Sequence, residues 1–345
     1  MRQVFFGPHS WCGQCIDHDL DSLSTIDETR RMSYYELHHA NCFDWLRDQP
    51  QRSIQGVCTD PPFGIVEFLP AEMAKLRNGR GGVWRLPPTI GGSQRAPLPR
   101  FTTLTSRERE HVRIYFREFG GALIPALVPG AHVFIAGTPM LQYLVQSGMA
   151  EAGFEIRGAV MRLYRGFRGG DRPKLAEQEF PEVCVTPRGA YEPWMLFRKS
   201  IEEKTVAQNL RKWGAGALRR LNVDQPLPDI IQSGKTPIVE ESISSHPTVK
   251  PQQFLRILVR SLLPLGAGKI LDPFCGSGST IAACQAAGYD AIGVEVDDEY
   301  FSLLKMNIDA FSALYPKYRG ETLEMTADYP SSKSKCTVSP QGSLL

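Results

Sequence analysis

Apolar positions alternate between a helical period and short buried runs, and the pattern is clearest near the C-terminal end of the chain. Residues 245–264 start with an extended turn and run into a predicted helix with one apolar face, formed by Phe254, Leu255, Leu258, Val259 and Leu262. Residues 269–296, KILDPFCGSGSTIAACQAAGYDAIGVEV, then read as a buried strand, a glycine turn, a helix of small residues and a second buried strand. This strand–helix–strand unit implies a parallel sheet.

Earlier segments show the same mixture of apolar runs and polar turns. A short strand near residue 35, a helix over 42–49 and a buried strand over 54–59 are predicted. The strand ends at Asp60-Pro61-Pro62, because proline cannot donate to a central sheet ladder. The pattern further predicts a helix over 107–128, a buried strand within 129–137, a helix through 152 and strands at 154–167 and 182–187.

These elements predict an α/β fold with one globular domain over 33–317. Residues 1–32 are polar and irregular, and we expect them to form an appendage. Two segments are predicted to be inserted into the domain: a loop over 66–110, rich in glycine, proline and arginine, and a second region over 157–245. Residues 318–345 are predicted to be a disordered tail.

The distribution of charge adds a candidate binding surface. The 345 residues carry a net charge of only +2, but residues 71–220 carry +11 and the remainder carries −9. A basic middle between acidic ends predicts a surface that faces a polyanion. Solvated loops that happen to be rich in arginine are the alternative.

Composition and cysteine usage narrow the class of protein. Hydrophobic residues make up 42% of the chain and charged residues 22%, which is ordinary for a globular protein. No apolar run approaches the roughly 20 residues that cross a bilayer, and no secretory segment is visible, so we expect a cytoplasmic protein without a membrane partner. Eight scattered cysteines fit a reducing compartment. His9, Cys12, Cys15 and His18 leave too little loop around a tetrahedral ion, so no metal is predicted, although zinc there stays open.

The glycine turn at residues 272–280 is a candidate cofactor site. A P-loop would need a lysine after the turn, and a dinucleotide fingerprint would need a third glycine; both are missing here. Asp272 would repel a pyrophosphate but suits an ammonium group. Glu295 ends the next strand, where a carboxylate can accept both hydroxyls of a ribose. S-adenosylmethionine carries an ammonium, a sulfonium and a ribose, and is therefore the predicted cofactor.

A second candidate site is Asp60-Pro61-Pro62-Phe63. The two prolines stiffen the turn, so the Asp60 carboxylate and the Pro61 carbonyl can be held as fixed acceptors. Such acceptors suit an amino group whose hydrogens must be gripped, and Phe63 can stack on a planar ring. An ordinary turn that ends a strand is the alternative.

Three ordered motifs resemble a known family. DPPF (60–63), HPTVKP (246–251) and LDPFCGSGST (271–280) look like the amino-directed DNA methyltransferases that modify N6 of adenine or N4 of cytosine. The motif order, catalytic before cofactor-binding, resembles their β class, a circular permutation of the usual order. The resemblance covers about 34–63 and 119–310. YEPW (191–194), LFRKS and NLRKWGAGAL are most similar to adenine methylases of phage and prophage type.

The resemblance implies a Rossmann-like sheet dependent on S-adenosylmethionine, with defined residue roles. Asp60, Pro61 and Pro62 would form the catalytic turn that holds the amine, and Phe63 would stack on a flipped base. Asp272, Phe274, Gly276 and Gly278 would line the cofactor and Glu295 would bind its ribose, while Thr248 and Lys250 would approach its methionine end. Asn41 stands where the family usually has an aspartate beside the cofactor adenine.

The resemblance also implies a reaction and partners. A methyl group would pass directly to the N6 amine of adenine in a specific sequence of double-stranded DNA, and the base would be flipped out of the duplex. The basic middle of the chain, rather than the resemblance, predicts the recognition contacts, in the region 157–245 and in the loop before it. They would be made to phosphates or guanine edges by two groups of arginines: Arg77, Arg80, Arg85, Arg95 and Arg100, then Arg162, Arg165, Arg168 and Arg172. We expect a bacterial, phage or prophage protein of the cytoplasm, with a homodimer and a paired restriction endonuclease left open.

Three alternatives remain from the sequence. Aspartate at the first catalytic position favours adenine, whereas serine is commoner among the N4-cytosine enzymes, which stay the runner-up. A catalytically silent DNA-binding module with the same fold is the second alternative. An RNA or protein amine methylase is the third alternative. The large basic insertions make it less favoured, because they suit an extended duplex.

Overall fold

The computed structural model describes residues 33–62, 89–90, 93–94, 104–164, 170, 172–173, 175–244, 246 and 249–323. The predicted appendage over 1–32 and most of the loop over 66–110 lie outside these residues. In the described part of the chain, no helix combines the length and hydrophobicity that a bilayer crossing requires.

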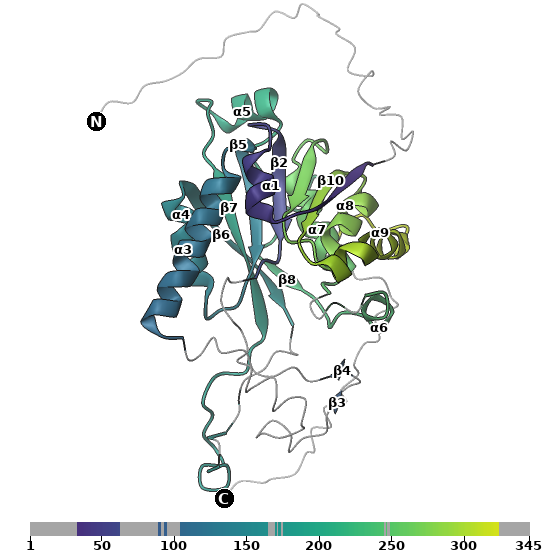
Figure 1. Ribbon diagram of the computed structural model, residues 1–345. Coiled ribbons are helices and arrows are strands. Elements are labelled where there is room, and N and C mark those ends of the chain that lie inside the picture. The colour runs from purple at the N-terminus through teal and green to yellow at the C-terminus, as the bar shows by residue number, and fades with distance from the viewer. Residues whose placement is uncertain are drawn as a thin grey trace, which may run out of the picture. The chain divides into compact units, whose positions relative to one another are not determined.

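One eight-stranded sheet organises the domain (Figure 1). Its spatial order is β1 (Tyr35–His39), β10 (Asp290–Glu295), β9 (Lys269–Asp272), β2 (Ile54–Thr59), β5 (Leu127–Ala136), β7 (Tyr191–Lys199), β6 (Phe154–Leu163) and β8 (Ile230–Gln232). The first five strands run parallel, β7 is antiparallel to both neighbours, and β8 runs parallel to β6. A separate two-stranded ladder joins β3 (Thr89–Ile90) and β4 (Ser93–Gln94).

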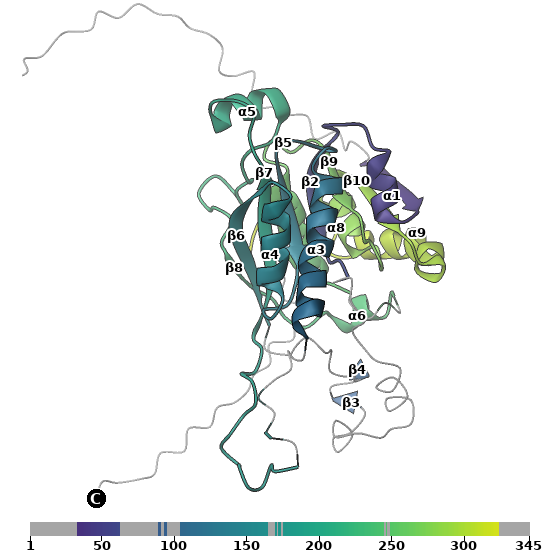
Figure 2. The same cartoon turned by 60° about the vertical axis from the view of Figure 1, so that its left-hand side comes forward.

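Helices cover both faces of the sheet (Figures 1 and 2). One core cluster joins the sheet to α1 (Cys42–Arg47), α3 (Ser106–Leu123) and α4 (Gln142–Glu151). The other cluster joins it to α7 (Gln252–Leu262), α8 (Ser279–Ala287) and α9 (Asp298–Ala313). Because β5 is buried along all ten residues between the two layers, its sequence is apolar apart from His132 and does not alternate. The predicted α/β fold is confirmed.

Several predicted elements differ from the structure: the helix over 42–49 ends at Arg47, and the strand over 154–167 ends at Leu163. The helix predicted over 107–128 ends at Leu123, because β5 already begins at Leu127 and continues through Pro129 and Gly130. The strand predicted over 182–187 is absent. Val183 and Val185 are exposed there, and the strand in this part of the chain is β7, whose residues 193–198 are buried.

The region predicted as an insertion over 157–245 belongs largely to the sheet. It contains most of β6 and the whole of β7 and β8, together with α5 (Val206–Trp213) and α6 (Ile238–Glu241). Helix α5 begins where the Thr205 hydroxyl accepts from the Gln208 amide and ends at Gly214 in the left-handed region. These strands complete the sheet and its core, and the role of 157–245 as an inserted recognition region stays a prediction.

The chain stays packed beyond the predicted end of the domain. The Tyr318 ring is buried, and the Tyr318 carbonyl oxygen accepts a hydrogen bond from the Arg256 guanidinium at 2.8 Å. The predicted start of the tail at 318 is therefore too early. Residues 324–345 lie outside the described residues.

Candidate active site

Three carboxylates meet at the edge of the sheet where the parallel strands end. Asp60 follows β2, Asp272 ends β9 and Glu295 ends β10. Because these strands are parallel neighbours, their carboxyl ends share one edge, which is where open α/β sheets bind ligands. A cavity of about 460 Å³ opens there, within the range of small-molecule sites.

Most of the predicted site residues line this cavity. They are Asp60, Pro61, Pro62, Lys250, Asp272, Phe274, Gly276 and Glu295. Phe63 and Thr248 lie outside the described residues. The structure thus brings the DPP turn, the lysine of HPTVKP and the glycine turn together across more than 200 residues of sequence.

Asp272 is a buried carboxylate with neutral hydrogen-bond donors. It is only 2% exposed, and it accepts from the Thr59 hydroxyl at 2.7 Å and from the Phe274 amide at 3.2 Å. Burial raises its pKa to about 7, which these donors offset only in part. A ligand cation placed against it would favour the ionised form, so Asp272 fits an ammonium group.

Glu295 is fixed by backbone amides. One of its oxygens accepts from the Gly276 amide at 2.7 Å, and the other accepts from the amides of Val296 and Asp297 at 3.0 and 2.9 Å. The carboxylate therefore stays in one orientation at the cavity wall. That arrangement suits an acceptor for ribose hydroxyls.

Two glycines allow the turn to pass close to other elements. Gly276 has a φ of +45°, and a Cβ there would lie 2.8 Å from Nε2 of His246. Gly278 precedes α8 with a φ of +81°, and its Cβ would lie 2.8 Å from the Ile308 side chain. Gly276 therefore shapes the cavity directly, whereas Gly278 permits the packing of α8 against α9.

Lys250 joins two carboxylates at the cavity wall. Its Nζ lies 2.9 Å from Oδ2 of Asp60 and 2.7 Å from Oε1 of Glu192. Burial alone would lower the pKa of Lys250, but the two carboxylates outweigh burial and raise it. Burial alone would raise the pKa of Glu192, but Lys250 and Arg162 outweigh burial and lower it.

Arg162 corrects one predicted role. It is 5% exposed, its Nη1 lies 3.3 Å from Oε2 of Glu192, and its Nε donates to the Ser233 hydroxyl at 3.1 Å. A buried guanidinium held by these partners does not grip a phosphate. The predicted contact with DNA is wrong because Arg162 lies on β6, a strand of the core sheet.

Asn41 caps a helix. Its side-chain oxygen accepts from the Phe43 amide at 2.9 Å at the start of α1, close to the end of β10, where the Ala40 amide donates to the Glu295 carbonyl. Asn41 is not among the residues that line the 460 Å³ cavity. Its contact with the cofactor adenine stays a prediction.

Several cavity residues carry no role in the sequence prediction. Glu192, His246, Asp297 and Tyr300 all line the cavity. His246 packs against the Tyr300 ring with 4.5 Å between centroids, and burial lowers its pKa. The motifs HPTVKP and YEPW, which contain His246 and Glu192, were visible in the sequence. Roles for these two residues could not be predicted, because the residues that they contact lie far away in sequence.

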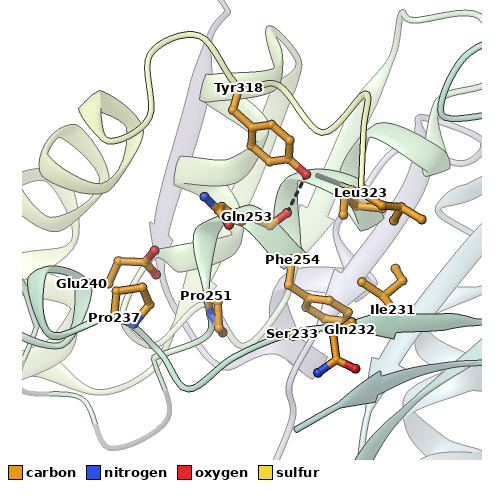
Figure 3. A pocket seen from close by; sticks show the side chains of 11 residues that line it. Ile231, Gln232, Ser233, Pro237, Glu240, Pro251, Gln253, Phe254, Tyr318 and Leu323 are labelled. Carbon is orange, nitrogen blue, oxygen red and sulfur yellow. Dashed lines mark hydrogen bonds between the residues drawn. The ribbon is translucent and has the colours of Figure 1, made fainter. Parts of the chain in front are cut away.

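A second, much smaller cavity lies beside α7. Figure 3 shows its lining side chains, with the Tyr318 hydroxyl donating to the Gln253 carbonyl at 3.4 Å. Its volume of about 10 Å³ is enough for about one water molecule. Glu240 contributes a buried carboxyl there, and burial raises its pKa to about 7. This cavity cannot take a cofactor.

Among the described residues, no group of three or more histidine, cysteine or acidic side chains is placed to hold a metal ion. His9, Cys12, Cys15 and His18 lie outside the described residues. The acceptors around the large cavity instead face a space suited to an organic cation.

Two curated bacterial methyltransferases are similar to this chain over most of its length. The type II methyltransferase M2.LlaDCHI of Lactococcus lactis subsp. cremoris is 30% identical over 284 residues, covering 80% of this chain and 91% of the relative. The type II methyltransferase M2.DpnII of Streptococcus pneumoniae is 22% identical over 276 residues, covering 79% and 89%.

A solved structure shares the fold. The cytosine-N4-specific PvuII DNA methyltransferase superposes with a TM-score of 0.51 at 14% identity, covering 80% of this chain and 86% of that one. The profile of a protein family described as DNA methylase matches residues 54–306, which contain Asp60, Lys250, Asp272 and Glu295. The chain therefore belongs to the DNA methylase family, the N6 and N4 amino-methyltransferases that use S-adenosylmethionine.

Proposed function

We propose that this protein transfers a methyl group from S-adenosylmethionine to the exocyclic N6 amine of adenine within a specific sequence of double-stranded DNA. The observation that carries the proposal is the meeting of the Asp60 turn with Asp272 and Glu295 around one cavity. The first supplies acceptors for an amine, and the other two supply acceptors for an ammonium and a ribose.

The amine-binding turn would act by geometry. An aryl amine is a poor nucleophile because its lone pair is delocalised into the ring. Acceptance of its two hydrogens by the Asp60 carboxylate and the Pro61 carbonyl favours a pyramidal nitrogen, whose lone pair can attack in line. The nitrogen–carbon bond would form as the carbon–sulfur bond breaks, and the amine would then release one proton to water.

The cofactor supplies an electrophilic methyl group on a sulfonium, and the chain's residues would bind and orient it. Asp272 would pair with the ammonium, and Glu295 would accept the ribose hydroxyls. Phe274 and Gly276 would form the wall between them. The cavity volume and the acceptor chemistry of these residues fit that ligand.

The proposal also covers the target base and a partner protein. Aspartate at the first catalytic position supports adenine, and N4 of cytosine is the alternative. Duplex DNA hides either amine, so the base must leave the stack before Asp60 can reach it. Both curated relatives are type II methyltransferases, which supports a restriction endonuclease as a partner. The proposed location is the cytoplasm of a bacterium. The gene would belong to the bacterium itself, to a phage or to a prophage.

Mass spectrometry of nucleosides tests the target. Duplex DNA from a host without methylases is incubated with the protein and S-adenosylmethionine, then digested to nucleosides. The proposal expects N6-methyladenine, absent with Asp60→Ala and present with Asp309→Ala, an exposed aspartate on α9. N4-methylcytosine alone would overturn the choice of adenine. DNA binding without any methylation would favour the silent module.

A further inference from the structure

A row of half-buried and buried charged side chains leads from the cavity into the sheet. Lys250 contacts Asp60 on one side and Glu192 on the other. The second oxygen of Glu192 accepts from Nε1 of Trp194 at 3.1 Å and from Nη1 of Arg162 at 3.3 Å. We call Asp60, Lys250, Glu192 and Arg162 the charge row. It alternates in sign and contains two acids and two bases.

Burial increases along the row. The side chains are 29% exposed at Asp60, 14% at Lys250, 11% at Glu192 and 6% at Arg162. The inner end is anchored to the segment that follows β8, because Arg162 donates to the Ser233 hydroxyl and to the Gly234 carbonyl at 2.9 Å. Buried charges persist only when they are paired and hydrogen-bonded, so each member depends on its neighbours.

The outer end reaches the residue to which we assign the target amine. Because Oδ2 of Asp60 pairs with the Lys250 ammonium, the other oxygen, Oδ1, would accept the amine hydrogen. The long Lys250 side chain has several rotamers, and Glu192 selects among them by holding its ammonium. Since reaction geometry is sensitive to displacements of about 1 Å, restraint of this carboxylate affects the rate of transfer.

We propose that Glu192 is a positioning residue for methyl transfer, which acts through Lys250 to fix the Asp60 carboxylate against the target amine. The inference rests on the proposed function, because it assigns Asp60 to the amine. It gives Lys250 a different task from the contact with the cofactor's methionine end that the family resemblance implies. Arg162 supports Glu192 from behind.

The same two strands offer a matched control. At the opposite edge of the sheet, Arg198 on β7 pairs with Glu155 on β6, with 2.6 Å between Nη2 and Oε2. This pair also joins an arginine to a glutamate across β6 and β7, but neither residue lines the cavity. Glu155→Gln therefore removes an arginine–glutamate ion pair between the same two strands, with a more exposed glutamate (33% against 11% for Glu192), without touching the charge row.

A double-mutant cycle tests the inference. Glu192→Gln, Lys250→Gln, the double variant and Glu155→Gln are compared with the wild type for kcat and KM of methyl transfer to duplex DNA, and for the Kd of S-adenosylmethionine. We expect kcat to fall about 30-fold in each charge-row variant, with KM and Kd within about twofold of the wild type. Glu155→Gln should keep the wild-type kcat.

Non-additivity is the decisive result, because contacting residues that act through one another couple strongly. If Glu192 acts through Lys250, the double variant should be no slower than Lys250→Gln by more than about threefold. Multiplied losses would overturn the inference, as would an unchanged kcat or a loss confined to the Kd of the cofactor. Wild-type protein without methyl transfer would instead count against the proposed function, before any variant is compared.

A milder variant guards against loss of folding. If Glu192→Gln does not fold, Trp194→Phe removes the indole donor to Glu192 and keeps an aromatic ring, although a smaller one, in this fully buried position. The inference then expects kcat to fall about threefold at an unchanged cofactor Kd. A wild-type kcat in this folded variant would overturn it.

Discussion

Asp272 and Glu192 are both buried carboxylates at the same edge of the sheet, yet their pKa values shift in opposite directions. Burial raises the pKa of Asp272 to about 7, because its donors, the Thr59 hydroxyl and the Phe274 amide, are neutral. For Glu192 the effect of burial is outweighed by Lys250 and Arg162, which lower its pKa. One carboxylate has its cations built into the fold, and the other is suited to a cation from a ligand.

The opposite pKa shifts assign Glu192 to the scaffold of the site and Asp272 to ligand binding. Environments that drive two pKa values apart assign different tasks to chemically similar groups. Glu192 stays ionised and organises its neighbours. Asp272 costs stability when it ionises in the free protein, and a bound ammonium would relieve that cost. The following predictions test this contrast.

Removal of the paired charge should have the largest effect on folding. Glu192→Gln leaves Lys250 and Arg162 without their shared carboxylate, so the free energy of unfolding should fall by about 3 kcal/mol. Asp272→Asn should leave it unchanged or raise it at pH 8, because it removes a buried carboxylate with neutral donors. Urea unfolding followed by tryptophan fluorescence measures both. Equal destabilisation by the two variants would break the contrast.

Removal of the other carboxylate should act on ligand binding. Asp272→Asn should weaken the binding of S-adenosylmethionine about 100-fold, since a buried charge-assisted contact with the ammonium is lost. Titration calorimetry measures the Kd. Glu240→Gln is the matched control, because Glu240 is also buried with a pKa raised to about 7 but faces the small cavity. A similar loss in both variants would contradict the assignment.

Glu240 should contribute to the pH dependence of stability. Its pKa is about 7 in the folded protein and near 4.5 in the unfolded chain, so the folded state binds more protons between these values. The free energy of unfolding should therefore fall by about 2 kcal/mol as the pH rises from 5 to 8. Glu240→Gln should remove this part of the decline, which urea unfolding at each pH would show. An unaltered pH profile would count against the raised pKa.

Cofactor binding should depend on pH through Asp272. Its carboxyl must ionise to pair with an ammonium, so affinity should rise about tenfold between pH 5.5 and 7. In Asp272→Asn the affinity should be nearly flat over this range. Calorimetry at several pH values separates the two cases, and a wild type without pH dependence would refute the role of Asp272.

The C-terminal part of the fold was the most predictable from the sequence. Glycine turns, small helix residues and buried strands lie close together there, so local patterns determine the elements. Strand β7 was harder, because Val183 and Val185 alternate like strand residues but are exposed, whereas the strand itself starts only at Tyr191. Which apolar run joins a sheet depends on its pairing partners, and these are distant in sequence.

The site, like the fold, contains residues that were predictable from the sequence and residues that were not. Asp60, Asp272 and Glu295 were predictable because each ends a recognisable strand. The charge row was not, since Glu192 and Lys250 are 58 residues apart and meet only through the tertiary fold. Arg162 was assigned to DNA from its charge alone, and its burial on β6 corrects that role.

The central claim is that Asp60 acts on the amine while Asp272 and Glu295 bind the cofactor. The most direct measurement compares the wild type and Asp60→Ala, both saturated with S-adenosylmethionine labelled with tritium in the methyl group, for transfer to duplex DNA. We expect Asp60→Ala to bind the cofactor within about threefold of the wild-type Kd but to transfer the label at least about 1,000-fold more slowly. Transfer by Asp60→Ala at the wild-type rate would contradict the account.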